Sequence, residues 1–312
     1  MSSFLYFLIG LTIGLFFWNY TRRKDRKDKN LLSDQKIKLQ QEKEIVVNFM
    51  HNLAVAIGEG VQRKDLYQRI VHTAVITTGA ISACVYERMP NGKLQSIATE
   101  GLFPSQRKVK ASQSEKSTTR ARFLERILAS EILECGEGIV GEVAKTGKPV
   151  YVPHAQNDPR VVKHDDPSLI LRSLIFSPLI HDDQIQGVLV VANPANGMPF
   201  SETDLSLVNS LAEQAALAIK NADAMNLRLE KTRMDSDLNL ARDVQELFLA
   251  KESPAFKGLE IDTQYVPSSQ VSGDFYDFYK LSATKFAISV ADVSGKGVPA
   301  SLLMALCQTN LR

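Results

Sequence analysis

The sequence predicts an α+β protein in which helices flank an antiparallel sheet, followed by a long helix and the start of a second, β-rich domain. Three observations predict this class. Short segments with an apolar period of two lie between residues 81 and 192, separated by turn residues. Amphipathic helical segments stand before and after them. Period-two segments return after residue 258, so the 312 residues accommodate two domains and connecting helices.

The composition is that of a folded globular protein, because 44% of the residues are hydrophobic and 23% are charged. The 37 basic and 35 acidic residues give a net charge of +2, so we expect no nucleic-acid partner. The cysteines Cys84, Cys135 and Cys307 are far apart and contain no CxxC pair, which excludes a disulfide framework and a zinc site. We expect three buried thiols in a reducing compartment.

Residues 1–20 predict a transmembrane anchor. Residues 4–18 are uncharged and rich in Phe, Leu and Ile, and Trp18 and Tyr20 suit a membrane interface. A cleaved signal peptide is the alternative, but there is no basic region before the apolar run and no small-residue cleavage site after it. The basic cluster at residues 22–29 follows, so the positive-inside rule places the remaining chain in the cytoplasm. We therefore expect a single-pass protein of the cell inner membrane.

Residues 21–44 are expected to form a basic juxtamembrane segment and a coiled-coil-like helix. A 3.5-residue spacing runs from Leu32 to Ile57 and is apolar at six of eight positions, which favours a parallel homodimer. Because Lys36 and Lys43 occupy the other two positions, a single amphipathic helix that packs on its own domain is an equal alternative.

The next segments alternate between helical and strand patterns. Helices are expected over residues 61–81 and 121–133, and a further helix begins after Ser201, whose partner Asp204 completes a capping box. Strands are expected over residues 81–88, 93–99, 150–152, 173–180 and 185–192. The polar residues 104–120 show no periodicity and are expected to form an insertion.

The residues from 45 to 222 resemble a GAF sensory domain. The resemblance is carried by Gly136–Val150, Asn157–Arg160, Ser177-Pro178-Leu179, Gly187-Val188-Leu189 and the helix over residues 200–222. It implies an antiparallel sheet flanked by helices. The Gly-x-Gly-x-x-Gly of residues 136–141 is also typical of a dinucleotide site, but a helix is expected before it and no βαβ unit surrounds it. We expect a turn into a helix that contains Val143 and Ala144.

The ligand of this GAF domain is unknown. Neither Cys84 nor Cys135 has the adjacent histidine of bilin-attaching members, and the Asn-Lys-x-x-x-Asp-Glu pattern of cyclic-nucleotide binders is absent. The five histidines are scattered without the spacing of haem ligands.

A long helix is expected to continue to residue 250, with residues 223–250 as a linker or switch helix. Its apolar seam from Val208 to Leu229 is out of phase with a second seam from Met234 to Phe248. Such a phase break is compatible with two helix registers, and equally with a plain linker that bends.

Residues 251–312 place carboxylates at the ends of predicted neighbouring strands. Strands are expected over residues 259–266, 275–281 and 286–293, and Asp274 and Asp292 lie at or near strand ends. Such carboxylates are costly unless they are paired or bind metal, which indicates a magnesium or manganese site. A helix over residues 298–310 follows, and we expect Leu302, Leu303, Ala305 and Leu306 to pack it on the sheet.

These residues resemble the N-terminal part of a PPM-type serine/threonine phosphatase β-sandwich of the SpoIIE/RsbU class. The resemblance is carried by Ser272–Asp277, Asp292–Ala300 and Leu240–Gln245. It implies that Asp274 and Asp292 are metal ligands, that the Val293 carbonyl is a third ligand and that Asp277 is a supporting carboxylate. Two Mn or Mg ions are implied, with no catalytic residue beyond the metal ligands. Ser272 departs from the family, which usually has Gly there.

The later acidic motifs of the phosphatase class do not occur up to Arg312, so we expect this chain alone to be inactive and to bind metal weakly. A diguanylate cyclase is disfavoured, because Phe275 stands where those enzymes need a Glu after the Asp.

The combined expectation is a membrane-anchored signalling protein in which a GAF sensor controls a metal-dependent phosphoserine/phosphothreonine protein phosphatase. By resemblance, its substrate is a phosphorylated anti-sigma-factor antagonist. The alternative is a non-catalytic GAF sensor or dimerisation module from a truncated gene. A GAF-containing histidine kinase is disfavoured, because no phospho-acceptor histidine follows residue 222.

Overall fold

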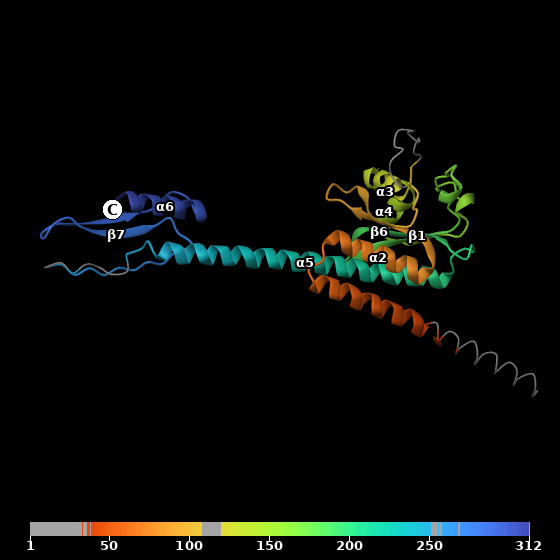
Figure 1. Ribbon diagram of the computed structural model, residues 1–312, viewed down its shortest axis with the longest axis horizontal. Coiled ribbons are helices and arrows are strands. Elements are labelled where there is room, and N and C mark those ends of the chain that lie inside the picture. Colours follow the sequence, from red (N-terminus) through yellow and green to blue (C-terminus); the bar gives the residue numbers. More distant parts are fainter. Residues whose placement is uncertain are drawn as a thin grey trace, which may run out of the picture. The chain divides into compact units, whose positions relative to one another are not determined.

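The computed structural model describes residues 39–107, 120–250, 258–267 and 269–311, together with Ser33, Lys36, Ile37 and Ala255 (Figure 1). The chain divides into two compact units, Met1–Asp223 and Ala224–Arg312. Each unit has its own sheet.

The first unit contains a six-stranded sheet whose strand order is β3-β2-β1-β6-β5-β4. Every neighbouring pair that the structure describes in this sheet is antiparallel. The strands are β1 (Ala80–Arg88), β2 (Leu94–Glu100), β3 (Ile132–Leu133), β4 (Val150–Val152), β5 (Leu174–His181) and β6 (Gln184–Pro194). The five predicted strands are therefore confirmed, and the two-residue β3 is an addition that the sequence pattern did not indicate.

Helices cover both faces of this sheet (Figure 1). They are a helix over residues 39–58, α2 (Arg63–Thr78), α3 (Arg120–Ser130), α4 (Gly138–Thr146), two short 3-10 turns η1 (Ala155–Asn157) and η2 (Pro167–Leu169), and α5 (Glu202–Glu246). Side chains of a strand alternate between its faces, so Val85 and Leu189 meet α2 and α5, whereas Cys84 and Val190 join the second core with α3 and α4. Two apolar cores result, one on each face.

The start of α5 is built by a reciprocal capping box, as the sequence predicts. The Ser201 hydroxyl accepts from the Asp204 N–H at 3.2 Å, and the Asp204 carboxylate accepts from the Ser201 N–H at 2.7 Å. From this cap α5 is continuous to Glu246, so the predicted phase break does not interrupt the helix.

The helix over residues 39–58 packs on its own domain from Phe49 onward. Phe49, Leu53 and Ala56 are buried in the core shared with α2 and α5, whereas Met50 is 43% exposed. The structure thus favours the amphipathic alternative over the 3.5-residue seam for this part of the helix. The predicted anchor at residues 1–20 lies outside the described residues. None of the helices in the described part of the chain is long and apolar enough to cross a membrane.

The structure tests two local expectations, one on the glycine motif and one on the cysteines. The glycine motif is a turn into α4, because Gly136 and Gly138 have positive φ and a Cβ on Gly141 would lie 2.5 Å from the Glu134 carbonyl oxygen. The expectation of three buried thiols is wrong: Cys84 is buried, but Cys135 and Cys307 are exposed. Cys135 lies in the turn between β3 and α4, and Cys307 lies on α6 outside its buried stripe.

The second unit contains a two-stranded antiparallel sheet of β7 (Phe275–Lys280) and β8 (Phe286–Ala291), with the helix α6 (Val298–Leu311). The predicted strand over residues 259–266 is wrong, since only Leu259 takes part in a bridge. Its apolar alternation is present, but a strand also needs a partner for its backbone groups, and the described sheet supplies none along this segment.

The expectation that the leucines of α6 pack on the sheet is also wrong. Leu302, Leu303 and Leu306 are 66%, 50% and 60% exposed. The buried stripe of α6 instead contains Ala300, Ser301, Met304 and Gln308. This stripe follows the four-residue spacing of one helix face, and its polar members have hydrogen-bond partners.

Candidate metal centre

The pairing of β7 with β8 sets Asp274 opposite Asp292. The register pairs Phe275 with Ala291, and the Val293 N–H donates to the Gly273 carbonyl at 3.3 Å, so the register continues past both strand ends. Directly opposite residues in an antiparallel pair lie on the same face with neighbouring Cβ atoms. The two carboxylates that the sequence singles out therefore point to one place.

The electrostatics of this pair reflect its closeness. Both side chains are exposed. A hydrogen bond with the Asp274 carboxyl and the charge of that group raise the pKa of the Asp292 carboxyl. Two carboxylates at this separation repel each other unless a proton or a cation lies between them.

The backbone beside the pair brings the Val293 carbonyl against Gly273. A Cβ added to Gly273 would lie 2.8 Å from the Val293 carbonyl oxygen and 3.3 Å from the Ala300 Cβ. Only a residue without a side chain permits this approach. The resemblance assigns the Val293 carbonyl as a third ligand. Val293 directly follows Asp292 and lies opposite Gly273.

Asp277 lies elsewhere. Residues three apart in a strand point to opposite faces, so Asp277 is directed toward α6 while Asp274 is not. It is 2% exposed, and its carboxylate accepts from the Phe278 N–H at 2.8 Å and from the Gln308 amide at 3.1 Å. The structure brings Asp277 together with Gln308 and does not bring it to the Asp274–Asp292 pair.

Gln245 of α5 fixes the loop that precedes Asp274. Its amide nitrogen donates to the Ser272 carbonyl at 2.5 Å, and its amide oxygen accepts from the Ser272 N–H at 3.1 Å. The Ser272 hydroxyl in turn accepts from the Asp274 N–H at 3.2 Å. Ser272, which replaces the usual Gly, therefore has a structural role in this chain. The resemblance indicated the helix that contains Gln245, but it did not predict the two hydrogen bonds between the Gln245 amide and Ser272, which we call the amide clamp. A glutamine at a buried helix position is the signal that could have revealed it.

We expect Gln245→Leu to loosen this loop. The change leaves the buried N–H and carbonyl of Ser272 without partners, at a cost of about 2 kcal/mol. Hydrogen exchange at the Ser272 amide should then rise about thirtyfold. Asn239→Leu, which removes an exposed amide from the same helix, is the matched control and should leave that rate unchanged. Equal rates in wild type and Gln245→Leu would contradict the clamp.

The pair stands without further side-chain ligands in the described part of the chain. There, no group of three or more His, Cys, Asp or Glu side chains is arranged to hold a metal ion. The described residues therefore bring two carboxylates together, which is fewer than the six oxygen ligands that a magnesium ion takes.

Comparisons with known proteins give relatives that are phosphatases by name. The chain is 38% identical over 80 residues to the phosphoserine phosphatase RsbU of Bacillus subtilis, which is 26% of this chain and 24% of that protein. It is 33% identical over 73 residues to the phosphoserine phosphatase RsbP of the same organism, which is 23% of this chain and 18% of that protein. The chain thus spans about a quarter or less of the length of these relatives.

Solved structures of GAF domains are also similar. The GAF domain of the Acinetobacter phosphoenolpyruvate-protein phosphotransferase is 20% identical, with a TM-score of 0.43, and the similarity covers 57% of this chain and 94% of that one. The second GAF domain of DevS from Mycobacterium smegmatis is 17% identical, with a TM-score of 0.40, over 54% of this chain and 99% of that one.

One protein family matches the sequence of the first unit. The family described as "GAF domain" matches residues 61–220, which is about half of the chain and contains the whole six-stranded sheet. The resemblance read from the glycine-rich segment and the Gly187-Val188-Leu189 strand is thereby confirmed. This chain belongs to the GAF domain family.

Proposed function

We propose that the protein is a GAF sensor that controls a metal-dependent phosphatase acting on phosphoserine or phosphothreonine of a partner protein. The observation that carries the proposal is the Asp274–Asp292 pair, whose carboxyl groups meet across the end of β7 and β8. The similarity to two proteins named phosphoserine phosphatases supports the same reaction class. By the resemblance to this class, the substrate is a phosphorylated anti-sigma-factor antagonist.

The donor atoms at the pair suit manganese or magnesium. Carboxylate and carbonyl oxygens are hard ligands, and a cation between Asp274 and Asp292 would relieve their mutual repulsion. Asp274, Asp292 and the Val293 carbonyl would hold the metal in this chain. When bound, a pair of such ions supplies a hydroxide nucleophile and neutralises charge on the phosphoryl group. The Gln245 amide keeps the Asp274 loop in place, and the Asp277–Gln308 contact holds β7 against α6.

The reaction is tested with a polypeptide that contains this chain and continues past Arg312. We expect it to release phosphate from a phosphoserine-bearing protein in the presence of manganese, and to stop when EDTA is added. If no such polypeptide shows metal-dependent release, the chain is instead a non-catalytic GAF sensor or dimerisation module. Analytical ultracentrifugation of the same polypeptide tests the proposed homodimer, which requires twice the mass of one chain.

Membrane attachment is a further part of the proposal and has its own test. Residues 1–20 are apolar and precede a basic cluster, so they would anchor the protein in the inner membrane with both units in the cytoplasm. A variant that lacks residues 1–20 should move from the membrane pellet to the supernatant after cell lysis and high-speed centrifugation. Continued sedimentation with the membranes at high salt would contradict the anchor.

A further inference from the structure

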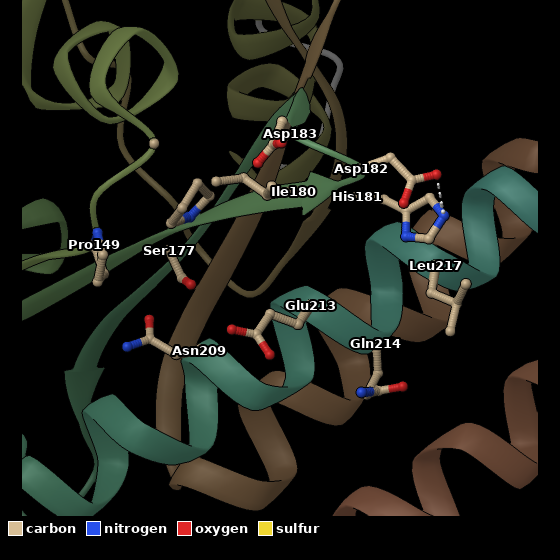
Figure 2. Close-up of a pocket in the computed structure, with 12 residues that line it drawn as sticks. Pro149, Ser177, Ile180, His181, Asp182, Asp183, Asn209, Glu213, Gln214 and Leu217 are labelled. Atoms are coloured by element: carbon tan, nitrogen blue, oxygen red, sulfur yellow. Dashed lines mark ion pairs between the residues drawn. The ribbon is translucent and has the colours of Figure 1, made fainter.

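A pocket of about 520 Å³ lies in the GAF unit, on the side of the sheet that α5 covers. Its wall comes from the end of β5, the β5–β6 turn, the segment between α4 and β4, and one face of α5. Figure 2 shows Ser177 and Asn209 directed into this space, with Glu213 one helical turn further along α5. The volume is within the range of pockets that hold small organic ligands.

Ser177 is a buried hydroxyl directed into this pocket. It lies on the strand face of Ile175 and Leu179, which belong to the core with α5, and it is only 1% exposed. Its hydroxyl has no hydrogen-bond partner among the described residues. A polar group on a buried apolar strand face ordinarily has a partner, so this hydroxyl is available to a ligand.

Asn209 and Glu213 supply two more acceptors beside it. They are four residues apart on α5 and therefore neighbours on one helix face. The Oδ1 atom of Asn209 is buried and has no hydrogen-bond partner within the described residues. The exposed carboxylate of Glu213 has no basic partner there either, so three acceptors meet at one end of the pocket.

The opposite wall is acidic as well. The β5–β6 turn contributes Asp182 and Asp183, both held at positive φ of 49° and 59°, which is an unusual backbone for residues other than glycine. His181 lies 3.2 Å from Asp182, and no Lys or Arg lines the pocket as described. Ile180, Leu217 and Pro149 add apolar surface.

We propose that this pocket binds a small aliphatic diamine. One ammonium group, with its three N–H donors, would bind Ser177, Asn209 and Glu213, and the second would lie toward the acidic turn. The methylene chain would rest on Ile180 and Leu217. A bare divalent cation fits less well, because the pocket is far larger than one ion and the described acidic side chains do not converge as metal ligands.

The pocket shares no residue with the candidate metal centre, and the inference does not rest on the proposed reaction, so the two proposals can fail separately. It is tested by isothermal titration calorimetry on the full chain with putrescine, using butanediol and magnesium chloride as comparison probes. We expect putrescine to bind at one site per chain, butanediol not to bind, and magnesium not to displace the diamine.

The variant Glu213→Gln should weaken putrescine binding at least about tenfold, because it replaces a charge-assisted hydrogen bond with a neutral one. Glu213 is exposed, so the fold should be unaffected. Glu230→Gln, which alters an exposed glutamate of α5 outside the pocket, should bind like the wild type. Ser177→Ala should weaken binding without lowering the Tm. The proposal would be overturned if putrescine did not bind, if Glu213→Gln bound putrescine as tightly as the wild type, or if magnesium displaced the diamine.

Discussion

Asp292→Asn should abolish the proposed manganese-dependent phosphate release by a longer polypeptide that contains this chain. The change removes one of the two proposed charged ligands, and the loss should exceed about a hundredfold, which is the upper cost of altering a mere supporting group of a metal site. Asparagine has the shape of aspartate, and residue 292 is exposed, so the fold should persist. Removing one of two adjacent negative charges also ends their repulsion, so the Tm should not fall.

The measurement is the initial rate of phosphate release at several manganese concentrations, together with calorimetric titration of manganese. Asp262→Asn is the control, because Asp262 is an exposed aspartate of the same unit that lies outside the pair. Its rate should equal that of the wild type. Undiminished turnover by Asp292→Asn would contradict the assignment of the metal centre to this pair.

Gly187→Ala should destabilise the GAF unit by about 3 kcal/mol. Gly187 lies in the central strand β6, between its partners Glu87 of β1 and Leu179 of β5. A Cβ at this position would be 2.2 Å from the Tyr86 carbonyl oxygen, and a backbone atom of a paired strand cannot move away alone. Either the β1–β6 pairing widens or the irregular register between β5 and β6 beside Gly187 must change, and both lose hydrogen bonds.

The effect is measured as a fall in Tm, which for a unit of this size corresponds to about 6–12 °C. Gly58→Ala is the matched control, because a Cβ on Gly58 meets no atom within 4 Å and the residue ends a helix at negative φ. It should leave the Tm unchanged or raise it slightly. A Gly187→Ala protein with the wild-type Tm would show that β6 does not pair with β1 as described.

Local periodicity was a sound guide to most of the GAF unit. The alternation over residues 185–192 corresponds to β6, and the Ser201 and Asp204 pair marks the start of α5. It failed where elements needed partners. The alternating residues 259–266 do not form a strand, and the apolar residues Leu302 and Leu306 of α6 are exposed. An alternating or apolar pattern shows which side chains of a segment could be buried. Whether those side chains are buried depends on the segments that pack against them.

The candidate metal centre was partly predictable in the same way. Two acidic residues at the ends of consecutive strands, joined by a short turn, are expected to meet, and Asp274 and Asp292 do. The three-residue spacing of Asp274 and Asp277 already implies opposite faces of a strand, although the resemblance groups the two residues together.

The sequence alone determined the GAF family, the order of the elements and the pair of carboxylates, because these follow from local spacing and from motifs that are continuous in the chain. Only the tertiary structure decided that Gln245 clamps Ser272, that Gln308 binds Asp277 and that Ser177 meets α5 in a pocket. These contacts join residues roughly 30 apart in the chain. They depend on which faces pack together, and side-chain periodicity within one segment carries no information about the partner segment.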